Sequence, residues 1–487
     1  MKGLIAVIAG MALSVAGAYA QRTETAASSA EVSSDTVCLT LDEALRVALS
    51  ENVAVKVADK EIEKAGYAKK GTYASLFPQI DFSGVYQRTI KKQVMYMDID
   101  MGDMGGGEGE AGEGGAGAGM GGMAAAAGGG IEVGRWNTYS AGISASMPIV
   151  NAQLWKSVQI SGQEVELAVE KARSSRLDMV TQVKQAYYAV LLAKEALAVY
   201  ESVYDNAVQN FKQTEMRYNA QKASELEYTR AKATVANAVP NVYNAESSVV
   251  LALWQLKAVM GVNLDEEIDV VGTLADYSDG MTFEILSDDF SLDGNTTMRQ
   301  LAIQAEELAN NVKLQKYAYL PSLAATFNLS VNAMTNDFNF SEYRWTPYSY
   351  VGLSLQIPIF SGGKRLNNVR QAKANATQLE LQMMNTERQL KIGIRQNLNT
   401  MQTNIKSYSA AQDAVATAQK AYDISSKSYF LGKSTITDVN DAQLALTQSQ
   451  LAASQAVYNF LVAKSALEQT LGHDFLDEEG NVDLENQ

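Results

Sequence analysis

The chain has 487 residues, a formal net charge of −15, one cysteine, one histidine, 35 glycines and six prolines. A single cysteine excludes an internal disulfide framework, and a single histidine excludes a metal cluster built from histidines. The acidic balance argues against nucleic acid as the main partner. At about 150 residues per domain, the length alone suggests roughly three ordinary domains.

The first 20 residues have the pattern of a secretory signal. Lys2 is a positive start, Leu4–Val15 is an apolar stretch, and Ala18-Tyr19-Ala20 is a cleavage motif. The apolar stretch is shorter than the about 20 residues of a spanning helix. We therefore expect export, followed by a flexible leader at 21–38 in which Cys38 is an unpaired thiol without function.

The sequence contains an internal duplication. The surroundings of Asn52 and Pro78 return 243 residues later, and those of Pro148, Tyr218 and Gly261 return 210 or 211 residues later. The two copies therefore span 39–261 and 297–472, with about 33 extra residues in the first copy. The matching positions in the second copy are Asn295, Pro321, Pro358, Tyr429 and Gly472.

The extra residues of the first copy form a glycine-rich insertion at 98–130. Met101–Gly130 holds 15 of the 35 glycines, with methionine and alanine between them, and predicts a flexible loop. Methionine sulfur binds cuprous ions, but such a cluster is more often composition alone. We expect no resident metal and no cofactor.

Two acidic segments complete the chain. The connection at 262–296 joins the copies, and Leu264–Met298 contains ten acidic residues and no Lys or Arg. The tail at 473–487 is acidic too, and it contains the single histidine, His473. Both segments are interpreted as solvated surface.

The second part of each copy carries an apolar residue at every seventh position. A seven-residue step keeps one stripe of apolar side chains in contact with a neighbouring helix when the helices form a left-handed supercoil. Breaks at 219–224 and 431–435 predict the turns of helix hairpins. The 67 residues from Gly363 to Tyr429 make a helix of about 100 Å, longer than a compact domain needs. The stripe positions include Val183, Val190, Leu197, Tyr204 and Phe211, then Ile394, Met401, Tyr408, Val415 and Tyr422.

Four segments of about ten residues alternate apolar with small or polar residues, as in membrane-spanning strands. Four strands are too few to close a barrel, and open edges are not tolerated in lipid. We therefore predict an oligomer: two copies would give eight strands with a filled interior, and three would give twelve strands with room for a lumen. A soluble β-layer covered by helices is the alternative. The segments are 80–87, 139–147, 323–331 and 351–359. Aromatic residues at their ends are interpreted as belts at the membrane interfaces; they are Phe77, Trp136, Tyr319, Trp345 and Tyr348.

Five of the prolines have positional meaning. Pro78, Pro148, Pro321 and Pro358 form two pairs related by the duplication and predict strand–helix corners. Pro240 falls within a predicted helix and should kink it.

These features resemble the TolC-like outer-membrane efflux proteins over nearly all of 39–472. The most specific pieces are IPIFSGGKR (Ile357–Arg365) and KSYFLGKSTITDVNDAQ (Lys427–Gln443), together with the duplication. The resemblance implies a mixed α/β membrane protein in which a trimeric twelve-stranded barrel continues into a long coiled-coil periplasmic tunnel. It also implies an exit duct that opens when an inner-membrane pump and a periplasmic adaptor dock.

The resemblance also implies entrance residues. Tyr429 matches a gating tyrosine, Asp438 and Asp441 match two carboxylate rings, and Glu227 matches a gate-bridging carboxylate. Ser434 departs from the pattern, because some members have an arginine there that pairs with the carboxylate. The ionic lock of the gate is therefore an open question.

Several alternatives follow from the same positions. Glu227 and Tyr429 can instead hydrogen-bond, or Lys222 or Lys433 can replace the missing arginine. Asp438 and Asp441 are three residues apart and share a helix face, where like-charge repulsion in a ring would raise the pKa of some carboxyls. The simpler interpretation is that both stabilise a helix N-terminus.

The leading prediction is a passive outer-membrane duct without catalysis, working as a homotrimer with a pump, an adaptor and outer-membrane lipid, and not with nucleic acid. The runner-up is a periplasmic coiled-coil adaptor or scaffold. A secreted enzyme has little support, because no nucleophile and base occur together in a recognisable motif.

Overall fold

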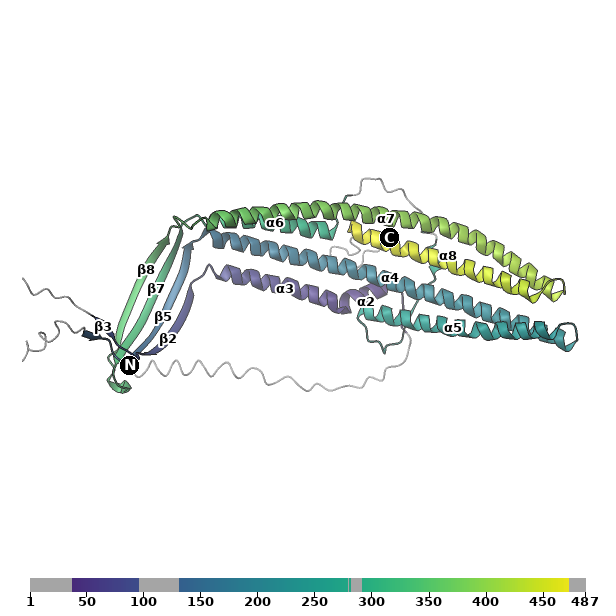
Figure 1. Cartoon of the computed structure of the whole chain (residues 1–487), viewed down its shortest axis with the longest axis horizontal. Helices are drawn as coiled ribbons and strands as arrows, with labels where there is room; N and C mark the ends of the chain where they lie inside the picture. Colours follow the sequence, from purple (N-terminus) through teal and green to yellow (C-terminus); the bar gives the residue numbers. More distant parts are fainter. Residues whose placement is uncertain (1–36, 96–130, 279, 282–290, 473–487) are drawn as a thin grey trace, which may run out of the picture.

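The computed structural model describes residues 37–95, 131–278, 280–281 and 291–472. The molecule is elongated, with a sheet at one end and long helical hairpins that reach to the other (Figure 1). The expected signal segment, the glycine-rich insertion and the acidic tail lie outside the described residues.

Each copy has the same order of elements and nearly the same helix lengths. The helix pairs contain 22 and 22, 68 and 67, and 36 and 36 residues. The predicted twofold repeat is therefore confirmed. The first copy has α3 (Val53–Ala74), β2 (Gln79–Arg88), β5 (Asn137–Val150), α4 (Ala152–Asn219) and α5 (Glu225–Met260). The second has α6 (Thr296–Tyr317), β7 (Ser322–Thr335), β8 (Thr346–Gln356), α7 (Lys364–Phe430) and α8 (Ile436–Leu471).

An asparagine joins the two ends of each copy. Asn52 and Asn295 cap α3 and α6 with their side-chain oxygens. The amide of Asn52 also donates to the carbonyl of Val259 at 2.6 Å, and that of Asn295 donates to Thr470 at 2.7 Å. Each hairpin then ends at a glycine with φ of 77° or 72°, which side chains rarely adopt. The start of each short helix is thereby fixed to the end of its hairpin.

The four main strands form one antiparallel sheet in the order β2-β5-β7-β8. Directly opposite residues point to the same face, so the register aligns the apolar positions of all four strands into rows. The predicted alternation therefore gives one apolar face and one polar face. One apolar row is Ile80, Ala145, Phe327 and Val351, and the next row, on the polar face, is Asp81, Ser144, Asn328 and Tyr350.

Two details of the sheet differ from expectation. Tyr348 was predicted to lie with the aromatic residues of the membrane interface, but it lies opposite Ser330 on the polar face, with its ring 5.7 Å from Tyr350. Pro148 lies inside β5, at a register shift against β7, because a proline is tolerated where pairing is irregular. The other three corner prolines lie between a helix and a strand: Pro78, Pro321 and Pro358.

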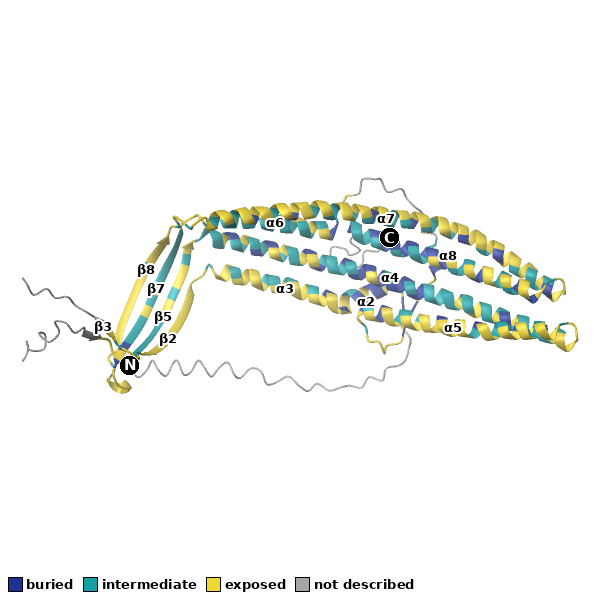
Figure 2. Ribbon diagram, viewed as in Figure 1, coloured by how far each residue is buried: buried dark blue, intermediate teal, exposed yellow. Residues whose placement is uncertain are grey.

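The largest buried cluster lies midway along the helices, where α4 passes α2 (Leu41–Glu51), as Figure 2 shows by its dark ribbons. Here β1 (Val37–Leu39) pairs in parallel with β6 (Ile268–Val270), next to the short helix η2 (Leu274–Tyr277). The leader therefore ends in a strand that contains the exposed Cys38. The acidic connection is also more than solvated surface, because its apolar residues enter this core.

The helices follow the predicted seven-residue step. Val183, Val190 and Ile394 are fully buried, and α5 continues through Pro240 as one helix. Among the helices of the described residues, none is long and apolar enough to cross a membrane.

Candidate gate at the hairpin tips

The two hairpins end in turns of the same backbone geometry. Gln221 in the first turn and Gly432 in the second both have a positive φ, 57° and 75°. In each turn a lysine N–H closes the end of the long helix, from Lys222 to Arg217 at 2.7 Å and from Lys433 to Ser428 at 2.8 Å. The duplication therefore sets the tip backbones, and the side chains decide how the tips interact.

Tyr429 is the central side chain of the contact between the tips. It is 1% exposed and packs with Ile436, Val439 and Tyr422. Its hydroxyl lies 2.8 Å from the hydroxyl of Thr214 on α4. Thr214 already donates its proton to the carbonyl of Asn210, so Tyr429 is the donor in this bond.

Arg217 holds the same tyrosine from a second side. Its guanidinium donates to the backbone carbonyl of Tyr429 at 2.7 Å and lies 4.9 Å from the centre of the Tyr429 ring. A charged donor makes a stronger hydrogen bond than a neutral one, and a guanidinium over an aromatic ring adds a cation–π attraction. The first hairpin thus holds the second through one arginine and one threonine.

The other lock residues expected from the sequence do not meet Tyr429. Glu227 lies in the first turn of α5, where its N–H is capped by the hydroxyl of Ser224 at 3.2 Å. Ser434 donates to the carbonyl of Ser425 at 3.2 Å within its own hairpin. The hydroxyl of Tyr429 therefore bonds to Thr214 and not to Glu227. Within the described residues, neither Lys222 nor Lys433 makes an ion pair.

Asp438 has a capping role in the single chain. Its carboxylate accepts from the N–H and the hydroxyl of Thr435, both at 2.8 Å, and its own N–H donates back to that hydroxyl. These hydrogen bonds lower the pKa of the Asp438 carboxyl, whereas the ring prediction expects repulsion to raise the pKa of some carboxyls. Asp441 lies one turn further along α8 and is exposed.

Polar pairs extend the contact between the hairpins behind the tips. They join α4 and α5 to α8, so the second hairpin is held along a short zone and not at one point. The pairs are Arg230 with Thr437 at 3.4 Å, Thr234 with Asn440 at 3.2 Å, and Asn206 with Gln443 at 3.2 Å.

Sequence reasoning missed Thr214 and Arg217. The duplication aligns Arg217 with Ser428, so a charged residue stands in one tip where the other has a small one. That asymmetry, next to the aligned pair Tyr218 and Tyr429, is the sequence signal from which Arg217 could have been found.

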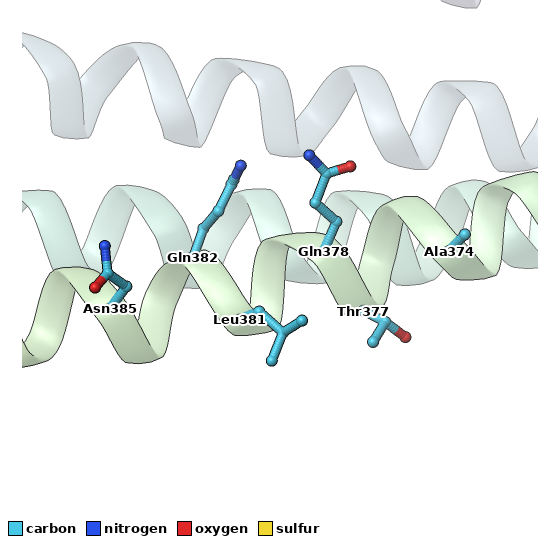
Figure 3. Close-up of a pocket in the computed structure, with 6 residues that line it drawn as sticks. All are labelled: Ala374, Thr377, Gln378, Leu381, Gln382 and Asn385. Carbon is cyan, nitrogen blue, oxygen red and sulfur yellow. The ribbon is translucent and has the colours of Figure 1, made fainter.

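The described residues form several hollows on the surface of the chain. The one in Figure 3, about 560 Å³, follows a stripe of α7 lined by amide, hydroxyl and apolar side chains. Gln378 and Gln382 point to one side of the helix, and Thr377 and Leu381 point to the other. Among the described residues, no group of three or more metal-binding side chains comes together.

An amphipathic sheet that continues into long paired hairpins in contact at their tips is typical of the subunit of an outer-membrane channel. The family model for outer membrane efflux proteins matches residues 44–262 and 290–473. The chain therefore belongs to this family, and it is an outer-membrane protein that extends into the periplasm.

Individual relatives agree with this assignment. Outer membrane protein TolC of Escherichia coli is 22% identical over 348 residues, 69% of this chain and 70% of that protein. Pyoverdine export outer membrane protein OpmQ of Pseudomonas aeruginosa is 24% identical over 353 residues, 69% of this chain and 70% of that protein. The CmeC outer membrane channel of Campylobacter jejuni has the same fold, with a TM-score of 0.67, 17% identity, and 96% of this chain and 94% of that chain covered.

Proposed function

We propose that three copies of this chain form one exit duct across the outer membrane, closed at the hairpin tips until an inner-membrane pump and a periplasmic adaptor dock. The transport energy comes from the pump, and the duct carries out no catalysis. The observation that supports the proposal most is the sheet, which has an apolar face, a polar face and two open edges.

The open edges are those of β2 and β8, the outermost strands of the sheet. Unpaired strand edges in lipid leave backbone groups without hydrogen bonds, at several kcal/mol for each group. When β8 of one copy pairs with β2 of the next, three four-stranded sheets close into twelve strands. The polar rows then line the lumen and the apolar rows face lipid. A periplasmic scaffold would have no use for apolar rows in register.

A pair of substitutions on β8 tests the faces. Leu353 lies on the apolar face and is 71% exposed in the single chain, and Tyr350 lies on the polar face. Leu353→Arg places a charge in lipid, at a cost of about 2–4 kcal/mol near the membrane centre, so the variant should fail to reach the membrane. Tyr350→Arg should still insert.

Extraction and mass provide the readout. The unmodified chain and Tyr350→Arg should need detergent for extraction and should then have the mass of three chains by light scattering. Release by salt alone would favour the scaffold. Equal insertion of the two variants would contradict the assignment of the faces.

Within this proposal, Tyr429, Thr214 and Arg217 form the lock of the gate, and Asp438 and Asp441 form the entrance rings. Three copies would place six carboxylates around the axis, which favours cations. Asp438→Asn combined with Asp441→Asn should weaken the block of single-channel current by divalent cations in planar bilayers. Unchanged block would rule out the rings and leave Asp438 as a helix cap.

A further inference from the structure

The segment between β7 and β8 folds back over the end of the sheet that lies away from the helices. Asn137, only 1% exposed, holds it in place. Tyr86 donates to the side-chain oxygen of Asn137 at 3.0 Å, and the amide of Asn137 donates to the carbonyl of Asp337 at 3.2 Å. Tyr343 donates to the same carbonyl at 2.9 Å. The segment is therefore fixed by hydrogen bonds that converge on the buried Asn137 and on the carbonyl of Asp337.

The folded segment covers the apolar face and not the polar one. Tyr86 and Tyr139 are opposite each other in a row on the same face as Phe82 and Ile143. The ring of Tyr139 lies 5.3 Å from Phe340, which belongs to the short helix η3 (Phe340–Glu342). Three aromatic side chains of this segment stay more than a third exposed: Phe338, Phe340 and Trp345.

Positive side chains gather around these aromatic rings. Arg88 lies 5.8 Å from the ring of Phe338, and Lys92 lies 4.7 Å from the ring of Trp136. We define the outer cuff as residues 88–92, 134–136 and 336–345. It contains five positive and two negative side chains, in a chain whose formal net charge is −15. The positive residues are Arg88, Lys91, Lys92, Arg135 and Arg344, and the negative ones are Asp337 and Glu342.

The negative charge of Asp337 is satisfied inside the cuff. Its carboxylate accepts from the hydroxyl of Thr335 at 2.6 Å and from the N–H of Asn339 at 3.4 Å, and Arg135 is close enough to act on it. Arg88 and Arg344 are exposed, so their guanidinium groups are presented outward next to amphipathic rings.

We propose that the outer cuff binds the phosphate groups of anionic lipids in the outer leaflet. This inference rests on the proposed function, because it requires the apolar face to lie in a membrane. Arginine forks match phosphate oxygens in pairs, and aromatic rings favour the level of the lipid headgroups. The outer cuff has both arginine side chains and aromatic rings on the lipid-facing side of the sheet, at the outer end of the strands.

The experiment compares lipids on the full-length oligomer purified in dodecyl maltoside. Native mass spectrometry measures retention of lipid A, a phosphorylated glycolipid, and of phosphatidylcholine, which has no net charge. We expect lipid A to be retained and phosphatidylcholine to be lost. Arg88→Gln with Arg344→Gln should weaken lipid A binding about tenfold, as expected for lost charge-assisted hydrogen bonds.

The matched control is Arg370→Gln with Arg388→Gln, two exposed arginines of α7, the helix that begins at the opposite end of the sheet from the outer cuff, and it should leave binding unchanged. Equal lipid A retention by the cuff variant and the unmodified protein would overturn the proposal. Displacement of lipid A by millimolar inorganic phosphate would also overturn it, because the cuff would then be a site for free anions. If the protein extracts without detergent, the proposed function fails instead.

Discussion

The two hairpin tips have almost the same backbone and very different side-chain surroundings. Tyr218 and Tyr429 occupy equivalent positions. In each turn the tyrosine carbonyl accepts a hydrogen bond from the N–H three residues later, from Gln221 at 2.8 Å and from Gly432 at 2.9 Å. Tyr218 is 37% exposed and stacks on Tyr228 of its own hairpin. Tyr429 is buried and is held by residues of the other hairpin.

The difference shows how two copies of one unit can bind each other through different side chains at equivalent positions. Once the turn is fixed by backbone hydrogen bonds, the side chains of each copy are free to diverge without altering the hairpin. The first copy presents Arg217 where the second has Ser428, and the second buries the tyrosine that the first exposes. Two tips identical to the second would have a tyrosine on both sides and a serine in place of the arginine on both.

The largest expected effect comes from removing the buried ring. Tyr429→Ala leaves a cavity between the tips, and such truncations cost about 3–5 kcal/mol. Tyr218→Ala is the matched control and should have less than half of that effect, since its ring is partly exposed. Closed-state conductance in planar bilayers should rise strongly for the first variant and little for the second. Equal rises would show that the tips are not functionally different.

Arg217→Gln should have the next largest effect. It removes a charged hydrogen bond, worth about 1.5–3 kcal/mol, together with the cation–π contact. Arg217→Lys keeps the charge but loses the planar fork, so it should restore the closed state only in part. Lys222→Gln, an exposed neighbour of the same tip, is the control. The lock assignment fails if Lys222→Gln opens the channel as much as Arg217→Gln.

One substitution in each of the two turns should have a smaller effect on stability, and the two effects should have opposite signs. Gly432→Ala forces a side chain into the left-handed region and should destabilise the second tip by about 1 kcal/mol. Gln221→Gly relieves the same conformation in the first tip and should stabilise it slightly. Thermal unfolding of both variants would measure the pair. Shifts of the same sign would mean that the turns are not equivalent.

The smallest effect concerns Asp438. Its folded pKa is lowered, so its contribution to stability is full above the unfolded pKa of about 4 and is lost as the pH falls through the folded pKa. Asp438→Asn should remove this dependence. Hydrogen exchange at the start of α8 at several acidic pH values would measure it. The opposite sign, with protection that increases as the pH falls, would indicate carboxylates facing one another in the assembled duct.

Much of the fold was predictable because it depends on periodicity. The period of two defined the strands, the step of seven defined the buried stripes, and the repeat offsets paired the elements. Tyr348 was misjudged because its position near a strand end does not reveal its face, which only the register with Ser330 gives. The strand at the end of the leader was not predicted, because Val37–Leu39 forms a strand only through its pairing with Ile268–Val270.

The candidate gate was less predictable. Tyr429 was found through the resemblance to a family, but its partners lie more than 200 residues away in sequence, at Thr214 and Arg217. No periodicity joins residues on two different hairpins. Their contact follows from how the two hairpins pack together, which depends on the packing of α8 against both α4 and α7.

The hydrogen bonds donated by the side-chain amides of Asn52 and Asn295 also have a consequence for evolution. Each of these hydrogen bonds fixes the end of one hairpin to the start of the short helix of the same copy. Neither hairpin can therefore slide lengthwise relative to the sheet. The distance from the membrane to the tips is therefore set by helix length alone. A lineage that needed a longer or shorter duct would have to add or remove whole seven-residue steps in α4, α5, α7 and α8 together, because a change in one helix would bring Tyr429 out of line with Arg217.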